Sequence, residues 1–485
     1  MERFYTEEIV IGLCGPIGVD LPGIAKILSE SLLSYEYSSE VIKLSKLIPV
    51  DGPGALGDPL RIKKSLIEAG NKLREQSGRG SILAEMAIEK ILVDRTKDFP
   101  DEKYASRRRC FVIDSIKNAS EARKLKEVYG ESFYLVGVFS TMDVRVNNLT
   151  RGDSSRRDLA QEIIDDDYNQ RGDFGQQVSK VFQTADYFFR LEGDAGTDGK
   201  VQRLIKLILG AEIITPNRAE TAMFAAASAA RNSACLSRQV GAAIIDDQGD
   251  IISTGWNDVP KYGGGAYSFG ENDHRCFNSG RFCRNDQEKK ALVSRIVDDL
   301  LASGAVDEGK REVAYKAIQN SPVSDLIEFS RAVHAEMLAI LNAAKAASGQ
   351  LKDAVLYCTT YPCHSCARHI VAAGIKAVYF IEPYAKSKAT ALHADSITSD
   401  EAVQEKLKIL AYEGVAPSRF LDFFSIKNNR KKEGVYSPLP KKELRPQVDK
   451  MFESVHVLEA VVVKGLKPSI GGDDDGERIP GANAA

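Results

Sequence analysis

The sequence predicts an α/β protein of two domains, the first of which is built on a parallel sheet. The chain has 485 residues, and a single hydrophobic core rarely grows beyond about 250–300 residues, so we expect two cores. In the N-terminal half, short apolar runs alternate with helical patterns, which is typical of parallel βαβ units. The composition, 43% hydrophobic and 27% charged, is that of an ordinary globular protein.

Three apolar runs predict the strands of the first domain, which we assign to residues 1–212. They are residues 8–14, 110–114 and 133–139. Helical patterns cover residues 22–34 and 119–129, and the pattern of 201–210 predicts a closing helix that ends at Gly210.

The second domain is assigned to residues 216–465 and begins after Thr215-Pro216. Its expected elements are a helix at 217–232, strands at 240–245 and 251–255, a polar insertion at 258–328, a helix at 330–347, a strand at 354–360, a helix at 363–374 and a strand at 376–381. A polar turn with Gly249 separates the first two strands and predicts a hairpin. Residues 466–485, rich in Gly, Asp and Ala, are expected to be a disordered tail.

Charge, hydropathy and cysteine usage narrow the class of protein. The formal net charge of −3 argues against a surface built to hold nucleic acid. The sequence has no apolar stretch of about 18 residues, so we expect no membrane span, and its start lacks a signal-peptide pattern. Two of the eight cysteines form a C-x-x-C, which predicts metal or redox chemistry and a cytoplasmic location.

Two short motifs predict a zinc site made by His334, Cys363 and Cys366. The cysteines stand three residues apart at a predicted helix start, which puts both sulfurs on one side of the first turn. The helix N-terminus favours their thiolate forms. His334 opens another predicted helix and offers the third ligand. A zinc ion with three protein ligands keeps one open position, where it lowers the pKa of water toward about 7.

Glu336 is the candidate general acid/base beside this metal. It stands two residues after His334, so it need not share the ligand's direction. A carboxylate there can move a proton from water to a ring nitrogen and to a leaving amine. His-x-Glu followed by Pro-Cys-x-x-Cys is the signature of zinc-dependent deaminases. The C-x-x-C alone is also compatible with a redox pair, but both motifs in this order favour zinc.

Residues 217–385 resemble the deoxycytidylate deaminase family. The resemblance rests on the segments 237–245, 254–257 and 333–336, together with the cysteine motif. It implies a cytidine-deaminase-like α/β/α sandwich with a mixed five-stranded sheet, and a homo-oligomer. It also implies that Asn257 contacts the sugar or base of the substrate and that Tyr384 lies near the base.

The first domain resembles a P-loop kinase whose phosphate loop is degenerate. Its glycine turn, with Gly15 and Gly18, follows the first predicted strand. The alignment puts Asp20 at the last glycine, Leu21 at the lysine and Pro22 at the hydroxyl residue of an active loop. Asp20 would bring negative charge toward phosphates, and Pro22 lacks a backbone donor. We therefore expect a structural or sensing module that does not bind ATP in the usual way.

The two domains together resemble bacterial anti-phage dCTP/dCMP deaminases. This implies deamination of free deoxycytidine nucleotides, depletion of dCTP, and control by the first domain. The sequence leaves the regulator open among a nucleotide, a phage product and a small RNA. The alternatives are a deaminase of tRNA or single-stranded nucleic-acid bases, a catalytically silent nucleotide sensor and a nucleotide kinase. The near-neutral charge counts against a nucleic-acid substrate, and the intact zinc motif counts against a silent sensor. Leu21, at the position of the catalytic lysine, counts against a kinase. The sequence leaves open whether His274, Cys276 and Cys283 bind a second, structural zinc, because they supply three ligands and a closed structural site needs four.

Overall fold

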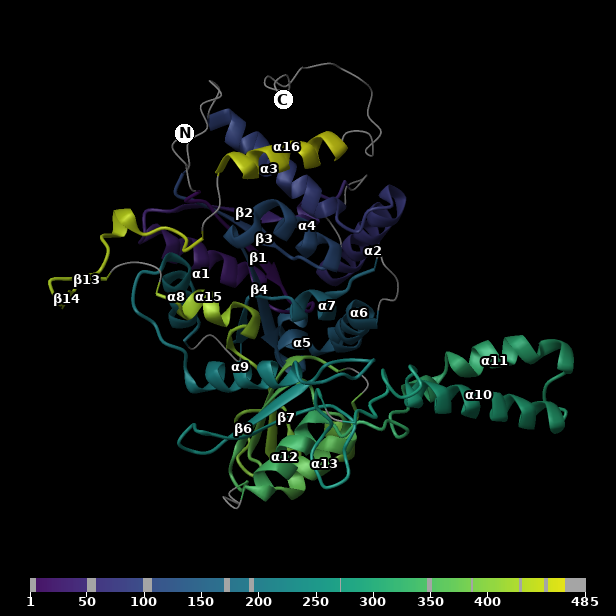
Figure 1. The fold of residues 1–485 in the computed structure, drawn as a ribbon. Helices are drawn as coiled ribbons and strands as arrows, with labels where there is room; N and C mark the ends of the chain where they lie inside the picture. The colour runs from purple at the N-terminus through teal and green to yellow at the C-terminus, as the bar shows by residue number, and fades with distance from the viewer. Residues whose placement is uncertain are drawn as a thin grey trace. The chain divides into compact units, whose positions relative to one another are not determined.

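The computed structural model describes residues 6–49, 58–98, 107–169, 175–191, 196–270, 272–346, 351–384, 387–426, 430–448 and 452–466. The chain divides into two compact units (Figure 1). One unit combines Met1–Pro216 with Glu413–Ala485, and the other is Asn217–Tyr412. The second unit is therefore an insertion into the chain of the first.

The first unit contains the predicted parallel sheet. Its strands are β1 (Ile9–Cys14), β2 (Ser38–Lys43), β3 (Arg109–Asp114), β4 (Phe133–Ser140) and β5 (Tyr187–Leu191). They lie in the order β2-β3-β1-β4-β5, all parallel, and β12 (Gly414–Val415) joins β5 in antiparallel orientation. The central strands have continuous apolar interiors because both faces of the sheet are buried.

Helices cover this sheet and complete the core of the first unit. They are α1 (Leu21–Leu33), α2 (Pro59–Ser77), α3 (Ile82–Asp98), α4 (Ala119–Tyr129), α5 (Met142–Thr150), α6 (Arg157–Asn169), α7 (Val178–Gln183), α8 (Thr197–Leu209), α15 (Phe420–Phe424) and α16 (Phe452–Leu466). Helices α1 and α8 pack together against the sheet through buried residues such as Leu28 and Leu204. The predicted closing helix is confirmed, with Gly210 as its left-handed C-cap.

The predicted C-terminal boundary of the second domain, residue 465, is wrong. The chain returns to the first unit at Glu413. In this returning segment, buried Arg419 donates hydrogen bonds to Asp186 at 2.9 Å and to the Phe133 carbonyl at 3.1 Å, both in the first unit. Helix α16 packs on α3, a contact visible in Figure 1.

The predicted disordered tail lies, from residue 467 onward, outside the described residues. A hairpin of β13 (Lys431–Lys432) and β14 (Val435–Tyr436) belongs to this returning segment.

The second unit contains the expected mixed sheet. Its strands are β6 (Gly241–Ile245), β7 (Ile251–Trp256), β8 (Val355–Thr360), β9 (Ala377–Glu382), β10 (Ile397–Thr398) and β11 (Leu407–Ala411), in the order β10-β11-β9-β8-β6-β7. The predicted β6–β7 hairpin is antiparallel, β6 also runs antiparallel to β8, and the remaining pairs are parallel. The sheet has six strands instead of the predicted five, because the two-residue strand β10 pairs with β11.

Two helices lie directly on the hairpin strands of the second unit. These are α9 (Arg218–Ala230) and α12 (Ala335–Lys345). A Cβ atom at Gly241 would lie 1.9 Å from the Ala226 carbonyl oxygen, and one at Gly255 would lie 2.3 Å from that of Ala335. Only glycine permits this approach, so Gly255 fixes the distance between α12 and the sheet.

Helix α12 begins later than the predicted residue 330. His334 has extended backbone, with φ −74° and ψ 156°, and acts as the N-cap. The remaining helices of this unit are α10 (Arg284–Ala302), α11 (Arg311–Gln319), α13 (His364–Ala372) and α14 (Ala389–Leu392). Helices α10 and α11 form an antiparallel pair within the predicted insertion (Figure 1). Among the described residues, no helix combines the length and apolarity that crossing a bilayer requires.

Candidate metal centre and substrate pocket

Three side chains from two helix N-termini converge in the second unit. His334 is the N-cap of α12, Cys363 is the N-cap of α13, and Cys366 lies in the first turn of α13. The Nδ1 atom of His334 lies 3.4 Å from the Cys363 sulfur and 3.3 Å from the Cys366 sulfur. Within the described ranges, no other group of three or more His, Cys, Asp or Glu side chains is arranged to hold a metal.

The geometry of this group fits zinc. Tetrahedral zinc with Zn–S of about 2.3 Å and Zn–N of about 2.0–2.1 Å places nitrogen and sulfur ligands about 3.6 Å apart. The distances of 3.3 and 3.4 Å lie within a few tenths of an ångström of that value. Both cysteines are buried, and His334 is partly exposed. The predicted zinc ligands are thus together, with the donor set of a catalytic zinc site.

Hydrogen bonds within the group favour a thiolate on Cys363. The Cys366 thiol donates to the Cys363 sulfur, and His334 lies beside it, so the pKa of Cys363 is lowered to about 4. The Cys366 backbone N–H also points at this sulfur, at 3.4 Å. The bond to Cys363 in turn raises the pKa of His334 to about 9. A metal that binds here replaces these shared protons, because metal ligands must be deprotonated.

Glu336 lies in the first turn of α12 and is 4% exposed. Burial raises the pKa of its carboxyl, and the nearby His334 opposes that shift. A raised pKa makes a carboxyl a stronger base, which suits a group that must both take up and release a proton. Its position and its pKa therefore suit the general acid/base role predicted for it.

A cavity of about 450 Å³ opens in front of this group. His334, Glu336 and Cys363 line it, as do the predicted substrate residues Asn257 and Tyr384. The volume lies within the range of about 300–1,000 Å³ that is usual for small-molecule sites. The fold therefore brings two of the three predicted zinc ligands, the predicted acid/base and both predicted substrate residues to one cavity.

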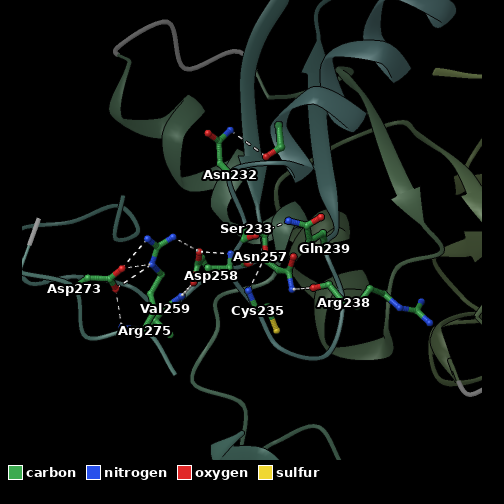
Figure 2. A network of polar contacts seen from close by, with 12 residues as sticks. Asn232, Ser233, Cys235, Arg238, Gln239, Asn257, Asp258, Val259, Asp273 and Arg275 are labelled. Atoms are coloured by element: carbon green, nitrogen blue, oxygen red, sulfur yellow. Dashed lines mark hydrogen bonds and ion pairs between the residues drawn. The ribbon is translucent and has the colours of Figure 1, made fainter. Parts of the chain in front are cut away.

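Asn257, however, is engaged with the protein backbone (Figure 2). Its Oδ1 accepts from the Val240 N–H at 2.7 Å, and its Nδ2 donates to the Arg238 carbonyl at 2.8 Å. The side chain is 8% exposed. These two bonds hold the segment before β6 against the end of β7. One hydrogen of Nδ2 and one lone pair of Oδ1 remain for a ligand.

A buried polar network beside Asn257 was not predicted from the sequence. The Asp258 carboxylate accepts from the Ala234 and Val259 N–H groups, at 2.9 and 2.8 Å, and from Arg275 at 3.3 Å. Arg275 also binds Asp273 at 2.7 Å (Figure 2). This network ties the insertion to the wall of the cavity. No local motif announces it, because its members lie on segments far apart in the chain.

The remaining sequence predictions concern other parts of the chain. Cys276 and Cys283 line the cavity, but among the described residues they form no metal group with His274. Gly15, Gly18 and Asp20 lie between β1 and α1 in the first unit. Gly18 has a φ of 90°, and Asp20 caps α1 by accepting from the Gly23 N–H at 3.0 Å.

Comparison with known proteins identifies the region that carries this site. Residues 216–382 match the family model described as the cytidine and deoxycytidylate deaminase zinc-binding region. The deoxycytidylate deaminase of Enterobacteria phage T4 is 29% identical over 171 residues, which are 35% of this chain and 81% of the phage protein. ComE operon protein 2 of Bacillus subtilis (strain 168) is 48% identical over 56 residues, 11% of this chain and 29% of that protein.

A solved structure gives a further match. The dCMP deaminase from the cyanophage S-TIM5, in complex with dCMP and dUMP, is 20% identical, with a TM-score of 0.24. That match covers 40% of this chain and 98% of the cyanophage chain.

Proposed function

We propose that the chain deaminates free deoxycytidine nucleotides in a zinc-dependent reaction. The matched zinc-binding region and the deoxycytidylate deaminase relatives support a hydrolase that acts on carbon–nitrogen bonds in cyclic amidines. The products are then dUTP, dUMP or both. The observation that carries the proposal is the convergence of His334, Cys363 and Cys366, with His334, Cys363 and buried Glu336 lining one cavity.

The residues divide the chemistry between them. A zinc ion held by His334, Cys363 and Cys366 supplies Lewis-acid activation of the attacking water. Glu336 takes a proton from that water and delivers it to the cytosine ring nitrogen. It then takes the remaining proton from the hydroxyl now on the attacked carbon and gives it to the amino group; the C–N bond breaks, the carbonyl of uracil forms and ammonia leaves. Burial of the Glu336 carboxyl raises its pKa, which suits a group that must both accept and donate within one cycle.

The free-nucleotide substrate is supported by the relatives and by charge. The phage T4 relative is a deoxycytidylate deaminase. Phosphates need cations, and Arg284, Lys289 and Arg331 line the same cavity. The near-neutral overall charge of the chain favours a small substrate over a nucleic acid.

The biological role that we propose is depletion of the dCTP pool in defence against phage. The support is the two-domain resemblance, in which a degenerate P-loop-kinase-like domain precedes the deaminase. The parallel sheet of the first unit and its glycine turn after β1 agree with that resemblance. We also propose a homo-oligomer and a nucleotide or small RNA as regulator, and the eight free cysteines support a reducing, cytoplasmic location.

The test is a substrate panel with the purified full chain. It compares dCMP, dCTP, CTP, cytidine and a cytosine-containing single-stranded oligodeoxynucleotide, with and without a zinc chelator, and product formation is followed by chromatography. We expect chelator-sensitive conversion of dCMP or dCTP, lost in Glu336→Gln and kept in the exposed control Glu405→Gln. Conversion of the oligonucleotide alone would replace the proposal with a nucleic-acid base deaminase. No conversion by zinc-loaded protein would contradict deamination.

A further inference from the structure

The first unit contains a cavity at the carboxyl ends of its central strands. The cavity measures about 220 Å³. Its walls come from the turn after β1, the end of β2, helix α2 and the loop after β3. In open parallel sheets, ligands bind outside the carboxyl ends of the strands. The cavity is therefore placed where this kind of fold binds its ligands.

Three lysines from three different segments line this cavity. They are Lys43 at the end of β2, Lys63 on α2 and Lys117 after β3. Lys43 lies 3.9 Å from Asp114, and Lys117 lies 3.4 Å from Asp167. Lys63 has no ion pair among the residues that the structure describes. Partial burial and the positive charges of Lys43, Lys117 and Arg151 lower its pKa. Within the described ranges, Lys43 and Lys117 thus have carboxylate partners and Lys63 does not, so an anion in the cavity would stabilise the charged form of Lys63.

The phosphate loop itself is already satisfied by carboxylates of the chain. Asp167, which is 2% exposed, accepts from the Ile17 N–H at 2.8 Å and pairs with Lys117. Asp20 caps the first turn of α1 through the Gly23 N–H. The backbone donors that an active loop offers to phosphates are therefore bound internally at these two points. An anion in this cavity is directed instead toward β2 and α2, where Lys43 and Lys63 lie.

Backbone strain marks the same place. Ser115 follows β3, lines the cavity and has a φ of 72°. A residue other than glycine rarely adopts this conformation, which concentrates at ligand-binding sites. The Ser115 hydroxyl donates to Asp114 at 2.9 Å. Leu44, Ile48 and Leu66 also line the cavity, so it offers both cations and apolar surface for an organic group.

We propose that this cavity binds a small phosphate ester, with Lys63 and Lys43 contacting its phosphate and the apolar lining residues contacting its organic part. The ligand is held beside the degenerate loop and not on it. This site lies wholly within the first unit and does not depend on the deaminase proposal. It gives the first unit a binding activity that needs no Walker lysine.

Calorimetric titration of the full chain with inorganic pyrophosphate and, separately, with adenosine 5′-monophosphate tests the proposal. Loss of one charged hydrogen-bond donor weakens binding by about 10- to 100-fold, so we expect that loss in Lys63→Met and in Lys43→Met. Lys64→Met is the matched control, because Lys64 is the adjacent residue and pairs with Glu162 at 2.7 Å. Tighter binding of the nucleotide than of pyrophosphate identifies an ester with an organic body.

Two results would overturn the proposal. One is the absence of binding of either probe at millimolar concentration by folded protein. The other is equal weakening, or none, in the lysine variants and in Lys64→Met, which indicates non-specific attraction of anions. Thermal unfolding of each variant confirms folding, and deamination by the Lys63→Met protein reports separately on the second unit.

Discussion

Replacement of Asn257 by alanine distinguishes a structural role of this residue from a role in substrate contact. The change removes two bonds, 2.7 and 2.8 Å long, and leaves the Val240 N–H and the Arg238 carbonyl without this partner. Both bonds are only partly buried, and a hydrogen bond contributes about 0.5–1.5 kcal/mol net, so the free energy of unfolding of the second unit should fall by about 1–3 kcal/mol. The segment before β6 also lines the cavity, so activity should fall as well.

The single tryptophan, Trp256, reports on this site because it is the neighbouring residue in β7. Urea unfolding followed by its fluorescence measures the loss, and with a slope of about 1–3 kcal/mol per molar urea the midpoint should shift by about 1 M. Asn232→Ala is the control, since the substitution removes a single side-chain bond, from Nδ2 to the Ala229 carbonyl at 3.1 Å. If Asn257→Ala unfolds like that control while KM rises, the structural account is refuted and the family-implied substrate contact is favoured.

Four further outcomes follow from the structure. Arg419→Ala should destabilise the first unit by about 3–5 kcal/mol, because it leaves buried Asp186 without its guanidinium; an unchanged melting temperature in circular dichroism would contradict this. Burial raises the pKa of Glu459 to about 7. The folded state then holds that proton more tightly than the unfolded state, so the free energy of unfolding should fall as pH rises from about 4.5 to 7. Glu459→Gln should flatten this slope in urea titrations across that range, and a slope equal to that of the natural protein would disprove the assignment. Gly255→Ala should displace α12 and lower the zinc content per chain in elemental analysis, whereas full occupancy would show that the helix tolerates the methyl group. Chelation should lower the unfolding temperature of the second unit, and no change would mean that metal binding is not coupled to its stability.

The residues of the metal site were predictable because their signal is local. Each motif combines a ligand with the helix start that positions it, so His334, Cys363 and Cys366 are found from spacing alone. The same holds for β1, β3 and β4, which are continuous apolar runs. Strand β2 was missed because it carries mostly polar or exposed residues.

Features that depend on distant partners could not be predicted. The role of Arg419 is visible only once β4 and β5 have placed the Phe133 carbonyl and Asp186 beside it. The two residues of β12 have no periodicity to detect. The backbone bonds of Asn257 likewise depend on the pairing of β6 with β7, so no pattern within the sequence predicts them.

The return of the chain to the first unit at Glu413 has a consequence for synthesis on the ribosome. The first unit cannot add its sixth strand, or the Arg419 contacts, until the whole segment Asn217–Tyr412 has been translated. The inserted unit can therefore fold while the first is still incomplete, which reverses the usual order in which N-terminal domains finish first. Ribosome-arrested chains that end near residue 412 should show a formed zinc group before β5 gains its antiparallel neighbour.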